Sequence, residues 1–129
     1  MLYALAPALA AVCVLLAVTA LRSRYGVVVV RGPSMAPTYV SGDRLLIRHL
    51  RGGDVRIGDV VLLRVPEDDG TVPEDAVIVI KRVVQTGDGS SVPAGSVVVH
   101  GDNRRQSVDS RVWGPVNVEH LLAKVVRKF

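Results

Sequence analysis

The chain has 129 residues, a formal net charge of +4 and 49% hydrophobic residues, of which few are aromatic. This length predicts a single small domain. The one cysteine, Cys13, excludes an internal disulfide framework and a cysteine-based metal site. One Phe, one Trp and three Tyr are too few for a base-stacking platform, so no nucleic-acid partner is expected despite the positive charge.

The first segment, residues 2–21, is uncharged, and Pro7 and Thr19 are its only non-hydrophobic residues. About 20 apolar residues rising 1.5 Å each cross the roughly 30 Å hydrocarbon core of a bilayer. The alternative is a cleavable secretory signal, with the small residues before Leu21 as its cleavage site. The segment has no Lys or Arg before its apolar run, and that run is longer than a signal usually has. We therefore expect a transmembrane anchor over residues 1–21.

The remaining residues, 22–129, alternate short valine-rich runs with Gly, Pro and Asp clusters, a pattern typical of an all-β domain. The sequence thus predicts a mostly β fold, a compact domain of about six strands behind one N-terminal transmembrane helix. The segments at 66–73 and 85–95 are polar and are expected to be exposed hairpin connections. The expected strands cover residues 25–31, 43–48, 59–65, 76–84, 95–100 and 122–127.

Charge is distributed in blocks along the chain. Residues 22–56 carry seven Arg against two Asp, residues 57–103 are net acidic, and residues 104–129 are net basic again. A basic stretch directly after a membrane span is expected to lie against anionic lipid headgroups, at about 1 kcal/mol per cation. Membrane lipids are therefore expected partners.

Three stretches depart from the strand pattern, in the order Gly-Pro-Ser-Met-Ala-Pro-Thr at 32–38, Lys-Arg-Val at 81–83, and a third at 101–115. The third begins Gly-Asp-Asn, continues through Ser-Val-Asp-Ser-Arg and ends Trp-Gly-Pro. Behind an N-terminal apolar span, this order resembles the bacterial type I signal peptidases over nearly the whole chain. The resemblance implies a largely β catalytic domain with a Ser–Lys dyad, which cleaves signal sequences from exported proteins at the outer membrane face.

Ser34 is the candidate nucleophile. Gly32, Pro33 and Pro37 predict a tight, exposed bend after a strand, from which a serine hydroxyl can reach a substrate carbonyl. Taken alone, this string fits an ordinary turn serine equally well. A serine hydroxyl becomes an effective nucleophile only when a base removes its proton.

Lys81 is the candidate general base. In a strand it shares a face with Val79 and Val83, so it is expected to be partly desolvated. Burial disfavours the ammonium form and lowers the pKa of a lysine, which makes a neutral amine available. The alternative is a lysine that extends from the strand end into solvent. The sequence around each of the three histidines makes it a weaker candidate for the general base than Lys81. These histidines are His49, His100 and His120.

The resemblance also implies supporting roles for the third stretch. Ser107 is expected to hydrogen-bond and orient Lys81. Asp109 is expected to pair with Arg111 and Arg82 and so brace the strand that carries the lysine. Asp102 and Asn103 match a Gly-Asp-Asn turn with a structural role, and Trp113 is expected to pack under the site.

Some members of the family have a serine two residues before the nucleophile, where this chain has Gly32. The oxyanion is therefore expected to rest on backbone N–H groups, chiefly that of Ser34, with Gly32 and Met35 as neighbouring oxyanion or substrate-binding positions. Residues 27–31 are expected to be an edge to which an extended substrate adds as a strand. Small side chains, as in Ala-x-Ala sites, would enter shallow pockets. No metal or cofactor is expected.

The function expected from these residues is a membrane-bound serine endopeptidase that removes signal peptides from exported precursors. The alternatives are a dedicated maturation protease for one precursor and a non-catalytic, membrane-anchored module that binds peptides. Arg22, Arg24 and Arg31 follow the span, which by the positive-inside rule favours a cytoplasmic domain. The resemblance implies the opposite, so we expect a single-pass protein of the cytoplasmic membrane with its 22–129 domain on the outer face.

Overall fold

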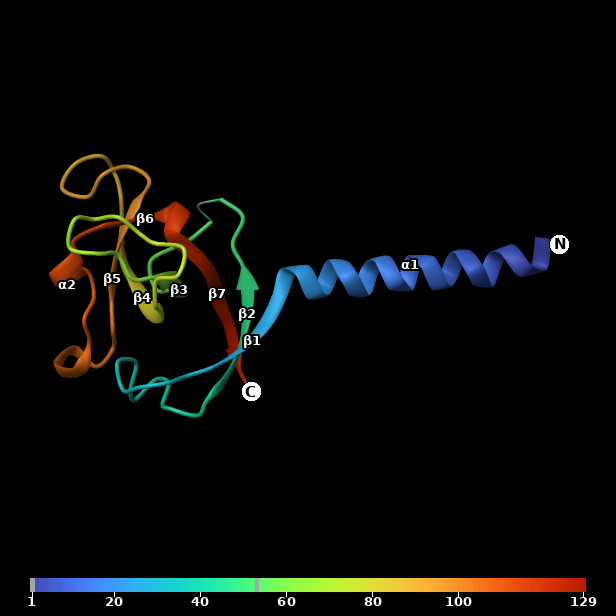
Figure 1. The fold of residues 1–129 in the computed structure, drawn as a ribbon, viewed down its shortest axis with the longest axis horizontal. Coiled ribbons are helices and arrows are strands. Elements are labelled where there is room, and N and C mark those ends of the chain that lie inside the picture. The colour runs from blue at the N-terminus through green and yellow to red at the C-terminus, as the bar shows by residue number, and fades with distance from the viewer. Residues whose placement is uncertain (1, 53) are drawn as a thin grey trace.

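The computed structural model of the chain describes residues 2–52 and 54–129. It consists of a long N-terminal helix and a curled seven-stranded antiparallel sheet from which the helix projects (Figure 1). The helices and strands in chain order are α1 (Leu2–Arg24), β1 (Tyr25–Val29), β2 (Arg44–His49), β3 (Val60–Arg64), β4 (Ile78–Thr86), β5 (Ser96–His100), α2 (Ser110–Trp113), β6 (Val116–Asn117) and β7 (Leu121–Lys128). Two short 3₁₀ turns cover Arg104–Gln106 and Val118–His120.

Helix α1 continues three residues beyond the predicted segment, and β1 begins at the next residue, Tyr25. Over Tyr3–Arg24 the helix is long and apolar enough to cross a membrane. A signal sequence near an N-terminus has the same length and composition, so both predicted interpretations remain compatible with it. None of its apolar surface is buried against the sheet, which is the arrangement that an anchor requires.

The strands lie in the order β1-β2-β7-β3-β4-β5-β6, and every neighbouring pair is antiparallel. Strand β7, the last in the chain, lies between β2 and β3, so the C-terminus ends beside the first hairpin (Figure 1). All six predicted strands are present, with ends that differ by up to two residues. The seventh, β6, was not predicted, because two residues are too few to show a strand periodicity.

The curled sheet buries side chains on both faces, as the alternation of a strand requires. Val61 and Leu63 of β3 pack into one cluster with Val83 of β4, whereas Leu62 packs into a second cluster with Ile47. Burial of each such side chain stabilises the fold by about 1.5–3 kcal/mol. Strand β4 therefore also presents different residues to the two clusters.

Candidate active site

The loop between β1 and β2 carries Ser34. Backbone hydrogen bonds from Val30 N to Asp43 O (2.8 Å) and from Gly42 N to Val30 O (2.9 Å) close the loop at its base. Met35, the residue after the serine, is fully buried and holds the loop against the sheet. Gly32 has φ +85°, a left-handed conformation that favours glycine, although an added Cβ would meet no atom within 4 Å. A serine at this position would therefore be strained by its backbone conformation.

The Gly-Asp-Asn turn holds this serine loop in place. Asn103 donates from its backbone N to Ser34 O (2.9 Å) and from Nδ2 to Pro33 O (3.1 Å). The hydroxyl of Thr38 donates to Asp102 Oδ2 at 2.6 Å. The role of Thr38 was not predicted, because its hydrogen-bond partner lies 64 residues further along the chain. Two of the three predicted stretches are thus in direct contact.

Arg82 joins the same network from β4. Its Nε and one terminal nitrogen donate to the two carboxylate oxygens of Asp102, each at 2.9 Å. This bidentate pair lowers the pKa of Asp102. The predicted pairing of Arg82 with Asp109 is wrong: adjacent residues of a strand point to opposite faces, and Asp109 lies on the side of Lys81.

Lys81 is buried, with only 3% of its surface exposed, and stands opposite Val61 of β3. Burial lowers the pKa of Lys81 below its ordinary value of 10.5; the charge of Asp109 opposes this shift and that of Arg111 adds to it. Among the described residues, no hydrogen bond or ion pair holds its amine. The expectation of a desolvated lysine is confirmed, and the alternative of a lysine extended into solvent is wrong.

Asp109 is the charged centre behind the lysine. Its carboxylate is fully buried and accepts hydrogen bonds from Ser107 Oγ (2.6 Å), Gly101 N (2.8 Å) and Arg111 N (3.1 Å). Burial alone would raise the pKa of Asp109, but these bonds and the Arg111 guanidinium 3.4 Å away outweigh it, so the pKa lies below 3.8. Asp109 is therefore ionised, and its predicted pair with Arg111 is formed.

Ser107 does not make the predicted bond to the lysine. Its hydroxyl has one proton, and the buried carboxylate of Asp109 is the stronger acceptor for it, at 2.6 Å. Ser107 is therefore connected to Lys81 only indirectly, through its hydrogen bond to Asp109.

Gly101 is the point at which these segments converge. A Cβ added there would lie 2.7 Å from Ser34 O and 2.6 Å from Ser107 Cβ, so no larger residue fits. Arg82 stands opposite His100 in the β4–β5 register, and continuing that register by one residue sets Gly101 beside Lys81. Gly101 was predicted only as part of a turn, because the need for glycine arises where Ser34 and Ser107 approach its backbone in the folded chain.

Three polar groups on the serine loop have no hydrogen-bond partner within residues 2–52 and 54–129. The hydroxyl of Ser34 makes no hydrogen bond there, to Lys81 or to any other group, and contacts between a nucleophile and its base often form only when substrate is bound. The backbone N–H groups of Ser34 and Met35 also donate no bond in that part of the chain. They are free to donate to a bound ligand.

A cleft of about 350 Å³ lies beside Ser34, between β1 and the start of β4. Strand β1 pairs only with β2, and β5 begins to pair with β4 only at Arg82, so both walls of the cleft have unpaired backbone edges. Trp113 does not line the cleft; it packs on the first core cluster. The lining residues are mostly apolar: Val28, Val29, Val30, Arg31, Ser34, Met35, Leu62, Ile78, Val79 and Ile80.

The fold and the site define a β-sheet protein with one long apolar helix and a largely apolar cleft beside Ser34. Residues 2–89 and 85–129 match the protein family described as signal peptidase, peptidase S26. The chain therefore belongs to the signal peptidase family.

Three relatives illustrate the likeness. The chain is 40% identical over 100 residues to the mitochondrial ATP-independent inner membrane protease subunit 1a of Arabidopsis thaliana, covering 67% of this chain and 60% of that protein. It is 35% identical over 103 residues to the mitochondrial inner membrane protease subunit 1 of Mus musculus, covering 70% and 61%. It is 34% identical over 109 residues to that of Schizosaccharomyces pombe, covering 75% and 68%. The aligned part thus spans about three fifths of the first two relatives.

Proposed function

We propose that this protein is a membrane-bound serine endopeptidase that removes N-terminal signal peptides from precursor proteins. The observation that carries the proposal is the buried Lys81, whose pKa is lowered, beside the glycine at which the backbone of Ser34 meets Ser107. Such a lysine can be neutral near physiological pH and can accept a proton from a serine hydroxyl. Membership of the signal peptidase family supports the same chemistry.

The precursor binds in the cleft as an extended strand. Its backbone pairs with the free edge of β1 and with the unpaired part of β4, and its alternate side chains enter the apolar lining. Because this lining consists largely of valine and isoleucine, it suits small apolar residues at the cleavage site, as in Ala-x-Ala.

The first chemical step is attack of Ser34 Oγ on the scissile carbonyl. Neutral Lys81 takes the hydroxyl proton, and the carbonyl oxygen becomes an oxyanion. The N–H of Ser34 donates to this oxyanion, with Met35 N–H as the neighbouring donor and Gly32 shaping the turn. One such donor contributes about 3–4 kcal/mol to transition-state stabilisation.

The protonated Lys81 then gives its proton to the leaving amine, which releases the mature N-terminus and leaves an acyl-serine. Water, deprotonated by Lys81, hydrolyses this ester and regenerates Ser34. Asp109 and Ser107 are positioning residues behind the lysine, while Asp102 and Asn103 keep the serine loop against β4.

The protein acts at a membrane. We place its anchor at residues 1–21 and its catalytic domain at residues 22–129, on the outer face of a cytoplasmic membrane, where exported precursors emerge. The apolar helix Tyr3–Arg24 supports the anchor, and the relatives are named as inner membrane proteases of mitochondria.

The test is cleavage of a signal-bearing precursor by the full chain in detergent, with the new N-terminus identified by mass spectrometry. Ser34→Ala and Lys81→Ala are expected to abolish cleavage, whereas the control Ser91→Ala, an exposed serine outside the cleft, retains it. Wild-type rates in both variants would disprove the dyad. A wild-type protein that binds precursors without cutting them would be a peptide-binding module, and cleavage of only one precursor in a panel would indicate a dedicated maturation protease.

A further inference from the structure

The end of the apolar helix carries a second concave site, well separated in the fold from the serine loop. Helix α1 has 23 residues and is about 35 Å long, close to the thickness of a bilayer core. Its last residue, Arg24, therefore lies at the level of the lipid headgroups when the helix spans a membrane. The concave site at this helix end would therefore be surrounded by lipid headgroups.

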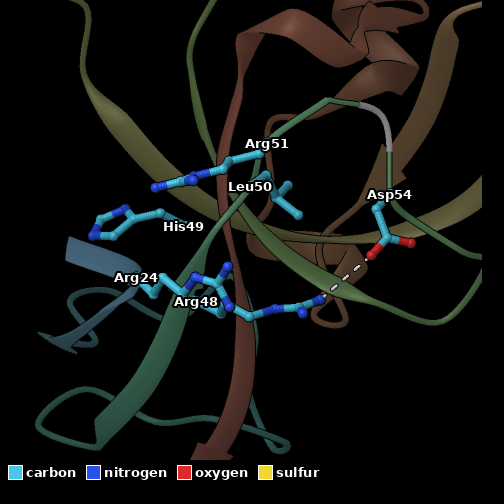
Figure 2. Close-up of a pocket in the computed structure, with 6 residues that line it drawn as sticks. All are labelled: Arg24, Arg48, His49, Leu50, Arg51 and Asp54. Atoms are coloured by element: carbon cyan, nitrogen blue, oxygen red, sulfur yellow. Dashed lines mark ion pairs between the residues drawn. The ribbon is translucent and has the colours of Figure 1, made fainter. Parts of the chain in front are cut away.

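Strand pairing brings further cations to this helix end. Strand β1 starts directly after Arg24, and its first residue, Tyr25, stands opposite Arg48 of β2. Leu50 and Arg51, which follow β2, thus lie near the helix end and help to line a pocket of about 180 Å³ (Figure 2). The residues that line it are Arg24, Arg48, His49, Leu50, Arg51 and Asp54.

The positive charge of this pocket is only partly compensated. Arg48 extends toward Asp54, at 3.5 Å between a guanidinium nitrogen and a carboxylate oxygen (Figure 2). Arg24 and Arg51 form no ion pair with any described residue. Three guanidinium groups around one pocket with a single carboxylate leave a net attraction for an anion.

We propose that this basic pocket binds the phosphate group of an anionic membrane phospholipid. Guanidinium groups match the oxygens of a phosphate bidentately, and Arg24 and Arg51 can supply two such forks. The headgroup phosphates of the leaflet lie at the same depth as Arg24, so the ligand is present at high local concentration. Binding there fixes the depth and tilt of the sheet relative to the membrane surface.

The proposal is tested by native mass spectrometry of the full chain in neutral detergent, titrated with phosphatidylglycerol or phosphatidylcholine. Wild-type protein is expected to bind phosphatidylglycerol at least tenfold more tightly than phosphatidylcholine. The double variant R24Q/R51Q is expected to lose this preference. The matched control R56Q/R105Q changes the charge equally, at exposed arginines outside the pocket, and is expected to keep it.

Circular dichroism shows whether each variant is folded. If the double variant does not fold, the single variant R51Q, which changes only a loop residue, replaces it in the binding measurement. Equal phosphatidylglycerol binding by wild type and a folded pocket variant would overturn the proposal. Inorganic phosphate is a separate arm: if it binds as tightly as the lipid and the same variants abolish it, the ligand is free phosphate and the lipid assignment is wrong. None of these readouts depends on peptidase activity.

Discussion

At the scale of the residue, Lys81 is the most unusual side chain of the domain, a lysine nearly as buried as Val61, which stands opposite it in the register. Its ammonium form destabilises the fold, since burial lowers its pKa and the amine makes no hydrogen bond with the described residues. Burial of the Lys81 amine therefore lowers the stability of the fold, and packing alone does not explain why a lysine occupies this position.

This cost predicts that Lys81→Met loses precursor cleavage without losing stability. The unfolded chain binds a proton that the folded chain releases, so wild-type stability rises with pH between the folded pKa of Lys81 and the ordinary 10.5. The variant lacks this rise and is expected to be at least as stable as wild type at pH 7. Urea unfolding at pH 7 and at pH 10 measures both effects. A loss of 3 kcal/mol or more, of the order found when a buried ion pair is broken, would show that the amine makes a stabilising contact.

Asp109 is the second informative residue, because its buried carboxylate satisfies three donors at once. Asp109→Asn keeps the shape and removes the charge, and we expect a loss of about 2–3 kcal/mol. Because the folded pKa is lowered, this stability is present above the unfolded value near 3.8 and is lost as pH falls through the folded pKa.

Thermal unfolding between pH 3 and pH 7 tests this expectation. The difference between wild type and Asp109→Asn should be constant above pH 5 and should shrink in acid. The exposed Asp68→Asn serves as the control and is expected to follow wild type throughout. A difference that stays constant in acid would mean that folding leaves the pKa of Asp109 unchanged, and a difference that grows in acid would mean that Asp109 is protonated in the fold.

At the scale of the element, the serine loop, the β4–β5 edge and the Gly-Asp-Asn turn meet at Gly101. We predict that Gly101→Ala reduces precursor cleavage strongly, because the new Cβ would displace Ser34 O or the Ser107 side chain. Gly26→Ala is the matched control: Gly26 lies within β1, outside the cleft lining, and its Cβ would make only ordinary contacts of 3.5 Å or more. Equal activity of the two variants would show that the serine loop can shift without consequence.

The elements show where sequence reasoning succeeds. Valine-rich runs bounded by Gly and Asp were enough to predict six strands, because residue composition and flanking turn residues are properties of each segment by itself. Strand β6 and the partners of Thr38 and Arg82 were not predictable, since they depend on segments that only the folded sheet brings together. Some predicted residues are in contact, such as Asn103 with the serine loop and Arg111 with Asp109. Two predicted pairings, Arg82 with Asp109 and Ser107 with Lys81, were wrong, because strand faces and tertiary contacts set these partners.

At the scale of the whole molecule, the helix and the sheet domain differ in the polarity of their surfaces. The helix buries none of its apolar surface in the described chain, while the charged residues belong almost entirely to the part that follows it. We propose that the helix spans a membrane with its N-terminus inside and the sheet outside, despite the arginines that follow the span. Protease added to intact bacterial spheroplasts that express the chain is then expected to degrade the sheet domain. A domain protected until the cells are lysed would contradict this orientation.

The central claim is that Ser34 is a nucleophile activated by Lys81, and covalent labelling tests it most directly. The full chain in detergent is treated with a serine-acylating inhibitor across pH 6 to pH 10, and the modified residue is identified by mass spectrometry. The account predicts labelling at Ser34 that rises with pH through a pKa below 10.5 and disappears in Lys81→Met. Labelling at another residue, or at Ser34 at the same rate in Lys81→Met, would contradict it.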